Sequence, residues 1–201
     1  DWNKSENVAL FYNIDIIDEA INTNRKIKFD YNKYGLDKKL HRSAFHIVSP
    51  YQMILHNQRY FMMAHQEKWK HITYYRLDRI TNIELLDEPA TDLRSIEGYQ
   101  NGIDYRRFSS ALPYMFSDEP QTIRFIIDGE WMIDQIVDWF GYDFSTDNKD
   151  GNLIVTVNAS PYAMEYWAMQ YLNYVEIISP SSLREQIIAN LKNAIGKYAK
   201  I

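Results

Sequence analysis

The start of the chain carries apolar side chains at helical spacing. Four of them recur every three or four positions: Leu10, Ile14, Ile17 and Ile21. Acidic residues lie between them, so this spacing would place the apolar residues together on one face of a helix. The pattern therefore predicts one amphipathic helix over residues 8–24, within a linker segment of residues 1–24.

From Lys26 onward the apolar positions recur with a period of two, which is typical of strands. Five short strand candidates follow, separated by turn residues: 26–31, 42–48, 51–56, 59–65 and 72–77. Short strands joined by tight turns suggest a small barrel, which closes its own edges and can present one mouth to a ligand. We therefore predict one β-barrel domain over residues 25–88.

After a polar, proline-containing stretch at residues 117–120, strand and helix patterns alternate. The predicted order is strand 122–127, helix 131–140, a strand pair around the turn 147–151, helix 161–172, strand 175–178 and helix 181–198. A βαββαβ order with right-handed crossovers gives a ferredoxin-like sandwich, with helices on one face of an antiparallel sheet. The sequence thus predicts an α+β protein, with a connector at 89–119 between the barrel and a C-terminal domain at 120–201.

Composition narrows the class of protein. The 201 residues include no cysteine, which excludes disulfides, thiolate metal sites and cysteine nucleophiles and favours a cytoplasmic setting. No apolar run reaches the roughly 18 residues of a membrane span, so no membrane partner is expected. The chain begins at Asp1 with neither a signal-peptide pattern nor an initiating methionine, and we expect it to be a piece of a longer protein.

Charge is unevenly distributed along the chain. Residues 25–79 contain 12 Lys and Arg against 4 Asp and Glu, whereas the remaining residues contain 10 against 23. The end of this basic stretch places Arg76 and Arg79 in an apolar strand pattern, as expected if a sheet presents guanidinium groups to an anionic or planar ligand. For either arginine alone, a structural pairing with a nearby carboxylate is an equal alternative. The acidic C-terminal half is not expected to touch DNA, because like charges repel.

Aromatic residues and all five histidines lie in the same basic stretch. These residues are Tyr51, Tyr60, Phe61, Trp69, Tyr74 and Tyr75, and His41, His46, His56, His65 and His71. Aromatic rings among basic residues suit base stacking and phosphate pairing, although most aromatic residues in strands pack in a core. The histidines lack the close spacing of metal ligands, so we predict no metal site and favour contact of a histidine with a phosphate or base.

No catalytic motif is present: the sequence has no G-x-S-x-G, H-E-x-x-H or G-x-x-x-x-G-K. The carboxylates around the predicted helix 131–140 are most simply its solvated face: Asp128, Glu130, Asp134 and Asp138. We therefore predict a binding protein with no catalytic residues and no cofactor.

Several segments, in order along the chain, resemble the WYL domain of bacterial transcription regulators. The resemblance lies in residues 26–31, 48–51, 59–64 and 75–80. The Trp-Tyr-Leu signature of that family aligns with Tyr60, Phe61 and Met62, so the middle tyrosine hydroxyl is absent here. The Arg-x-x-Arg portion is intact at Arg76 and Arg79. Residues 113–116 and 175–180, with Trp167, resemble the C-terminal extension of these regulators, called WCX, so the resemblance covers nearly the whole chain.

The resemblance implies an Sm-like β-barrel that senses an effector, often a nucleic acid or a nucleotide-like ligand. It also implies a winged helix-turn-helix before Asp1, through which the parent protein would contact DNA. By position in the family pattern, Arg79, Arg76, Tyr60 and Phe61 are candidate effector contacts. His46 and Tyr51 are added to this set because of their strand parity and side-chain chemistry.

These features predict the effector-sensing part of a transcriptional regulator that works as a homodimer. An anionic ligand would neutralise the basic mouth of the barrel and shift the domain arrangement, and the helix at 8–24 would pass this change to the DNA-binding part. Two alternatives remain open: a module that holds single-stranded nucleic acid as its working substrate, and a scaffold without a ligand whose dimer is built by the WCX-like domain. Salt dependence separates a polyanion from a small ligand.

Overall fold

The structure is a computed structural model that describes residues 9–56, 58–104 and 118–199. The chain forms two units, residues 1–103 and residues 104–201, each with its own hydrophobic core. Part of the predicted connector, including the segment 113–116, lies outside the described residues. No helix in the described ranges is long and apolar enough to cross a membrane.

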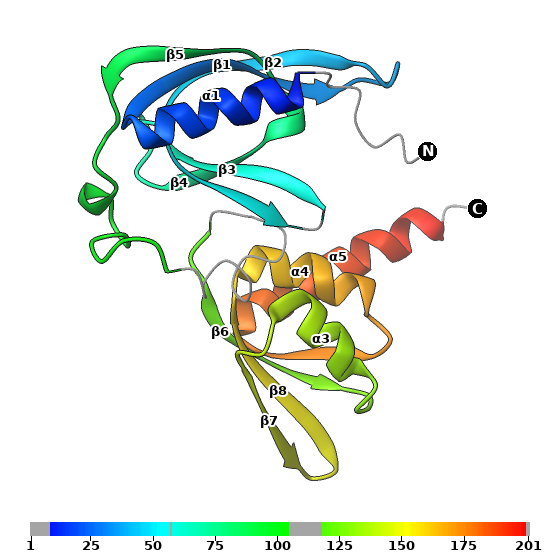
Figure 1. Cartoon of the computed structure of the whole chain (residues 1–201). Helices are drawn as coiled ribbons and strands as arrows, with labels where there is room; N and C mark the ends of the chain where they lie inside the picture. The colour runs from blue at the N-terminus through cyan, green and yellow to red at the C-terminus, as the bar shows by residue number, and fades with distance from the viewer. Residues whose placement is uncertain (1–8, 57, 105–117, 200–201) are drawn as a thin grey trace. The chain divides into compact units, whose positions relative to one another are not determined.

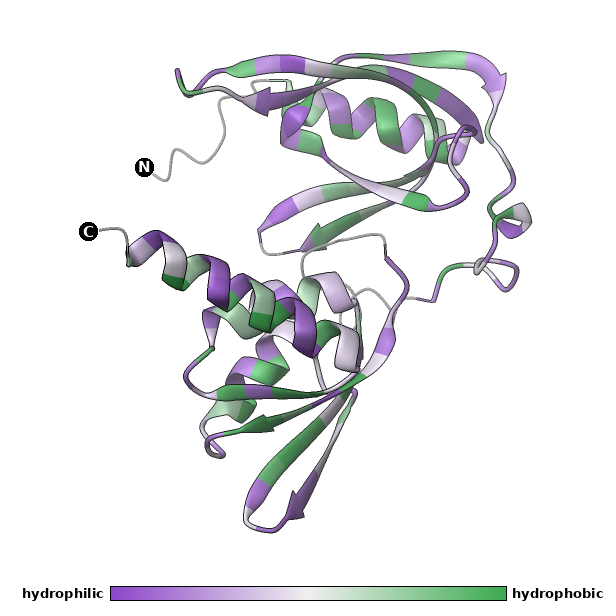
Figure 2. Ribbon diagram, turned by 180° about the vertical axis from the view of Figure 1, so that it is seen from behind, coloured by the Kyte–Doolittle hydropathy of each residue, from purple (hydrophilic) through white to green (hydrophobic). Residues whose placement is uncertain are grey.

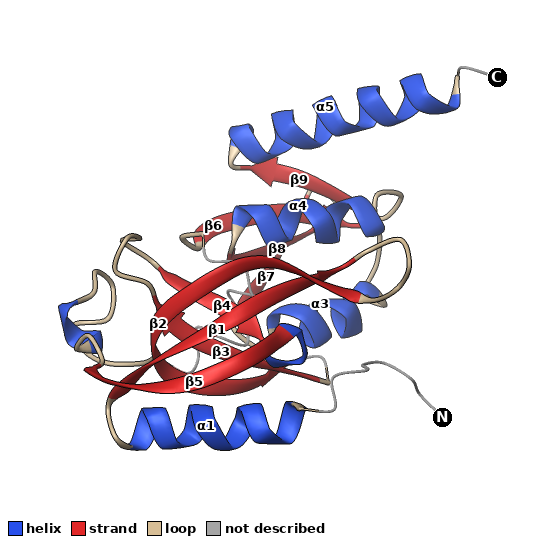
Figure 3. Cartoon of the chain, turned by 90° about the horizontal axis from the view of Figure 1, so that it is seen from above, coloured by secondary structure: helices blue, strands red, loops and turns tan. Residues whose placement is uncertain are grey.

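The first unit begins with helix α1 (Leu10–Asn22), which confirms the helix predicted over 8–24 within the residues described. Its apolar stripe is buried at Ile17 and Ala20, which pack against the inner face of the first sheet. Figure 1 shows α1 running between the β1–β5 part of that sheet and its β3–β4 part, and Figure 3 shows it lying alongside the strands.

The first sheet contains five antiparallel strands in the order β4-β3-β2-β1-β5. The elements are β1 (Arg25–Tyr34), β2 (Leu40–His56), β3 (Arg59–His65), β4 (Ile72–Arg76), a one-turn 3-10 helix η1 (Leu77–Arg79) and β5 (Ile80–Pro89). A further 3-10 turn, η2 (Leu93–Ser95), follows. In the described residues, no hydrogen bonds pair β4 with β5, so the ladder has two edges.

Three strand predictions in this unit need correction. Residues 42–48 and 51–56 form one strand, β2, whose first half pairs with β1 and whose second half pairs with β3. Pro50 does not end the strand because the register shifts by one residue between Pro50 and Gln52, and such a bulge tolerates proline. The strand predicted over 72–77 ends at Arg76, and β5 was not predicted.

The second unit follows the predicted element order closely. Its elements are β6 (Gln121–Ile127), α3 (Met132–Phe140), β7 (Phe144–Lys149), β8 (Asn152–Ala159), α4 (Pro161–Gln170), β9 (Val175–Ser179) and α5 (Ser181–Tyr198). The strands form an antiparallel sheet in the order β7-β8-β6-β9. Asp150 and Gly151 both have positive φ, as a two-residue hairpin loop of type I′ requires. In Figure 2, β6 and β8 are coloured mainly hydrophobic, whereas the edge strand β7 is mainly hydrophilic.

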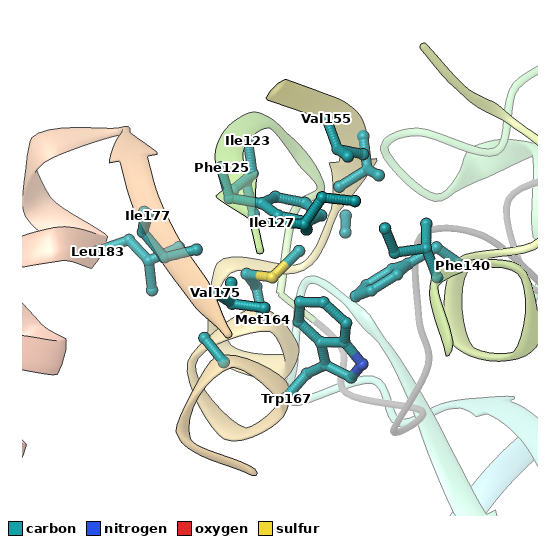
Figure 4. Close-up of a cluster of buried hydrophobic side chains, with 14 of the residues drawn as sticks. Ile123, Phe125, Ile127, Phe140, Val155, Met164, Trp167, Val175, Ile177 and Leu183 are labelled. Atoms are coloured by element: carbon teal, nitrogen blue, oxygen red, sulfur yellow. The ribbon is translucent and has the colours of Figure 1, made fainter. Parts of the chain in front are cut away.

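The core of this unit lies between one face of the sheet and the helices. Alternate residues of β6, β8 and β9 point to that face, and α3, α4 and α5 cover it. The fully buried ring of Trp167 is central, because it packs against both Phe125, at 5.4 Å between ring centroids, and Phe140, at 5.1 Å. Figure 4 shows these three rings among the surrounding aliphatic side chains.

Candidate functional site

The two arginines of the Arg-x-x-Arg pattern lie on either side of η1. Arg76 ends β4, and its Nε and Nη2 donate to Asp78 at 3.0 and 2.6 Å. Arg59, at the start of β3, donates to the same carboxylate at 3.2 Å. Asp78 is only 7% exposed. One buried carboxylate therefore holds two guanidinium groups. For Arg76, the alternative of a structural pairing with a nearby carboxylate is the one observed.

Two opposing effects act on the Arg76 guanidinium. Partial burial disfavours its charged form, but the hydrogen bonds and negative charge of Asp78 more than offset burial, and the pKa of Arg76 is raised. Arg76 consequently stays charged and oriented, with its backbone N–H donating to the Tyr31 hydroxyl at 3.2 Å.

Arg79 differs from Arg76 because no carboxylate of the described residues forms an ion pair with it. Its side chain is half-buried, and its Nε is buried without a hydrogen-bond partner in the described part of the chain. A buried N–H donor without an acceptor is costly, and most such groups in proteins are satisfied. Arg79 is therefore the strongest candidate in this unit for contact with an anionic group.

The backbone of η1 is held by two buried asparagines that sequence reasoning missed. Asn13 on α1 donates to the carbonyl oxygens of Ile80, at 2.9 Å, and Leu77, at 3.4 Å. Asn32 on β1 donates to the carbonyl oxygen of Arg79 at 2.9 Å. A polar residue on the apolar face of the predicted helix was the one available signal for Asn13. These bonds fix the turn and link it to the first helix.

The two signature residues Tyr60 and Phe61 point to opposite faces of β3. Phe61 is paired in register with Arg76 of β4, on the face away from the core cluster. Tyr60 shares the face of Met62, but it lies near the start of the strand and is 42% exposed. The structure therefore brings Phe61 together with Arg76 and does not bring Tyr60 to the same face.

His46 belongs to the core side of β2. It is 7% exposed, and its ring lies 5.0 Å from that of Tyr75 and 5.5 Å from that of Phe29. Its Nδ1 lies 3.2 Å from the side-chain oxygen of Gln66. Burial lowers the pKa of His46, with the Gln66 hydrogen bond opposing that effect. His46 is thus a packed residue, separate from the arginine turn.

Tyr51 lies at the bulge of β2 and holds the segment after β5. Its hydroxyl donates to the Thr91 carbonyl oxygen at 2.9 Å, and the neighbouring Ser49 hydroxyl accepts from the Thr91 N–H at 2.9 Å. Burial raises the pKa of Tyr51 to about 12. Of the six candidates, Phe61, Arg76 and Arg79 gather around η1, whereas His46, Tyr51 and Tyr60 lie elsewhere on the sheet.

Part of the basic stretch is neutralised by β5, which follows it in the chain and lies beside β1. Three ion pairs join these strands: Arg25–Asp87 at 2.5 Å, Lys28–Glu84 at 2.9 Å and Lys26–Glu88 at 3.1 Å. The positive charge inferred from sequence is therefore not spread over the surface of the sheet. In the described residues, no ion pair is formed by Arg79 or by five lysines in or beside the turns: Lys33, Lys38, Lys39, Lys68 and Lys70.

Comparison with known proteins identifies both units. Residues 12–85 match the family model of the WYL domain, and residues 118–195 match that of the WCX domain. No curated protein matches the sequence.

Among solved structures, a protein described as CRISPR Cas-related is similar with a TM-score of 0.59 and 14% identity, over 97% of this chain and 54% of that one. Proteasome accessory factor B/C (PafBC) of Arthrobacter aurescens aligns with a TM-score of 0.41 and 17% identity, over 95% of this chain and 28% of that one. This chain thus spans about half the length of the first and less than a third of the second. At such identities the likeness concerns the fold alone. The family matches carry the assignment, and the chain belongs to the WYL-domain family, with a WCX domain after its WYL domain.

Proposed function

We propose that this chain is the effector-sensing part of a transcriptional regulator, and that its WYL domain binds an anionic, nucleotide-like or nucleic-acid ligand at the η1 turn. The observation that carries the proposal is the guanidinium of Arg79, whose buried Nε lacks an acceptor in the described residues. A phosphate oxygen would supply that acceptor in a charge-assisted hydrogen bond. Phe61 and Arg76 lie beside the turn and would complete the contact.

The turn also offers a route from ligand to helix. Asn13 joins the carbonyl oxygens on both sides of Arg79 to α1. A ligand that moves the Arg79 side chain and its turn would change these hydrogen bonds. We propose that α1 passes this change to a DNA-binding part elsewhere in the parent protein, in the cytoplasm.

Arg79→Gln in a fluorescence-anisotropy assay tests the site. The probes are labelled single-stranded DNA and RNA oligonucleotides, with cyclic nucleotides as competitors. We expect Arg79→Gln to weaken binding about tenfold or more, because one charge-assisted hydrogen bond is lost. Arg42→Gln is the matched control, since it removes one exposed arginine charge, which is paired with Asp30. Equal effects of the two substitutions would contradict the proposed site.

Asp78→Asn should have the opposite effect on binding from Arg79→Gln. In the unsubstituted chain, the Asp78 carboxylate forms ion pairs with both Arg59 and Arg76. Replacing it with the amide would release two guanidinium groups for an anionic ligand, so we expect tighter binding and a steeper fall of affinity with salt. Unchanged affinity and salt slope would show that the ligand does not approach this turn.

We also propose a homodimer in which α5 supplies the contact. Three exposed apolar residues, Ile188, Ile195 and Tyr198, lie with the half-buried Leu191 at alternating three- and four-residue spacing. Such a stripe suits pairing of two helices. Ile188→Glu with Ile195→Glu should give a monomer by light scattering, while Lys197→Glu should not. A monomeric unsubstituted chain at high concentration would contradict this proposal.

For the fold, we propose that the first sheet is an Sm-like barrel and that the WCX domain is ferredoxin-like. The short η1 turn between the two edge strands of the first sheet supports the former proposal. The order β7-β8-β6-β9 supports the latter, since two crossovers in a βαββαβ chain place the first and last strands side by side.

A further inference from the structure

The β3–β4 turn, residues 66–71, carries a second group of aromatic and basic side chains. The rings of Trp69 and His71 are stacked, with an interplanar angle of 8° and 5.8 Å between centroids. The Lys68 ammonium lies 5.0 Å from the centroid of the Trp69 ring. Lys68, Lys70 and His71 are exposed, and in the described residues neither lysine pairs with a carboxylate.

Contacts with neighbouring residues of the same unit hold this turn in place. The backbone N–H of Trp69 donates to the Gln66 carbonyl oxygen at 2.8 Å. The Trp69 ring lies edge-on to the ring of His46, with 6.2 Å between the ring centroids. His65 Nε2 lies 2.8 Å from the Trp69 carbonyl oxygen. Trp69 is therefore an anchored ring, while His71 continues the stack toward solvent.

His65 itself offers a hydrogen-bond acceptor. A carbonyl oxygen can only accept, so the short contact requires a proton on His65 Nε2, and in the neutral ring Nδ1 is then an acceptor. His65 is 9% exposed, and its Nδ1 is buried without a partner in the described part of the chain. The residue lines a pocket of about 310 Å³ beside the turn. A hydroxyl or amino donor of a ligand would satisfy this nitrogen.

The pocket is not itself an anion site. Two lysines line it, and one of them, Lys26, is held between Glu67, at 2.6 Å, and Glu88, at 3.1 Å; hydrogen bonds to these two carboxylates raise the pKa of Lys26. The other lining lysine, the exposed Lys68, and the neighbouring exposed Lys70 form no ion pair in the described part of the chain. Phosphates would therefore stay outside the pocket, and uncharged polar groups would enter it.

We propose that the β3–β4 turn is a stacking subsite for a single-stranded oligonucleotide. One base would stack on His71 and extend the Trp69–His71 pair, and Lys68 and Lys70 would contact the flanking phosphates. A base N–H or sugar hydroxyl group would donate to His65. This inference rests on the proposed function and narrows its ligand. β4 separates the turn from Arg76 by four residue steps, about 13 Å, so a ligand that reaches both ends is longer than one nucleotide.

Two variants of the whole chain test the subsite, with labelled single-stranded oligothymidine and unlabelled thymidine monophosphate as probes. His71→Ala should weaken oligothymidine binding at least about fivefold through loss of a stacked base and leave the mononucleotide within about twofold. Lys68→Gln with Lys70→Gln should lower the slope of log affinity against log salt by about 1.4, as expected for two phosphates of a single strand.

Lys33→Gln with Lys39→Gln is the matched control, because it removes the same charge at the β1–β2 turn, where neither lysine has a carboxylate partner in the described residues. Thermal melts that match the unsubstituted chain will show that each variant folds. Trp69 is left intact because its ring and backbone anchor the turn.

The possible failures are distinguishable. If the turn variants bind oligothymidine as the control does while Arg79→Gln weakens it, the subsite is wrong and the arginine site stands. If only the mononucleotide binds, and binds through Arg79, the oligonucleotide class is wrong. If the turn variants lose binding and Arg79→Gln does not, the subsite stands and the arginine site is wrong. If neither probe binds, both are wrong for this ligand class.

Discussion

His46 is a buried core residue that contributes to stability, a role that its position in a basic stretch did not indicate. Its ring packs against Phe29 and Tyr75, and burial lowers the pKa of the imidazole below its ordinary value. Protonation then favours the unfolded chain, in which the imidazole titrates near pH 6.5. The contribution of neutral His46 to the free energy of unfolding is therefore complete above this pH, and it is lost as the pH falls from there through the lower pKa of the folded state.

His46→Phe tests this assignment by urea denaturation at pH values of about 7.5 and about 5.5, on either side of the ordinary histidine pKa. Phenylalanine keeps the ring contacts and cannot be protonated, so the variant should lose less stability on acidification than the unsubstituted chain. The other histidines and carboxylates are common to both proteins and cancel in the comparison. An equal loss in both would show that His46 does not contribute to acid sensitivity.

Sequence reasoning found the arginines and kept open the carboxylate pairing that holds Arg76, but it missed the asparagine that holds their turn. Arg76 and Arg79 stand in a recognisable pattern, whereas Asn13 acts on carbonyl oxygens 64 and 67 residues further along the chain. His46 and Tyr51 were chosen from strand parity, which predicts the face of a residue but not what covers that face. The structure places His46 under other rings and ties Tyr51 to Thr91.

Among the elements, β5 shows why local pattern was insufficient. Its sequence includes Glu84, Asp87 and Glu88, which read as a polar segment when taken alone. The strand buries Ile80 and Ile83 in the core and places these carboxylates beside the basic residues of β1. This match becomes visible only when strands about 60 residues apart are paired. In the second unit, by contrast, each helix and strand carries its own period and turn residues, and every predicted element is present.

The contact of α1 with η1 is testable as a contact between elements. Asn13 is 1% exposed, and Asn13→Leu would leave the Leu77 and Ile80 carbonyl oxygens without their donor, so we expect a loss of about 1–3 kcal/mol in urea denaturation. Asn22→Ala on the same helix removes only an exposed hydrogen bond to Asp18 and should cost less than about 0.5 kcal/mol. Equal losses for the two variants would mean that the Asn13 bonds do not secure the helix.

For the whole molecule, the division of charge follows the division of the fold. Residues 104–201 contain 13 Asp and Glu against 8 Lys and Arg, and the candidate site lies entirely in the other unit. Because each unit has a separate core, we expect the proposed ligand binding to require only the first unit to be folded. The acidic WCX domain is left for the contact between protomers that we propose.

A fragment of residues 1–103 should therefore fold and bind alone. We expect one cooperative thermal transition, and an affinity for single-stranded oligothymidine within about twofold of that of the whole chain, since Arg79 and the β3–β4 turn are both retained. Residues 104–201, expressed as the complementary fragment, should fold around Trp167 but should not bind, because their net negative charge repels the phosphates. Circular dichroism and fluorescence anisotropy check both expectations. If the first fragment folds but loses affinity while the whole chain binds, the site must include groups from beyond residue 103, and Arg79 with its turn would not be sufficient.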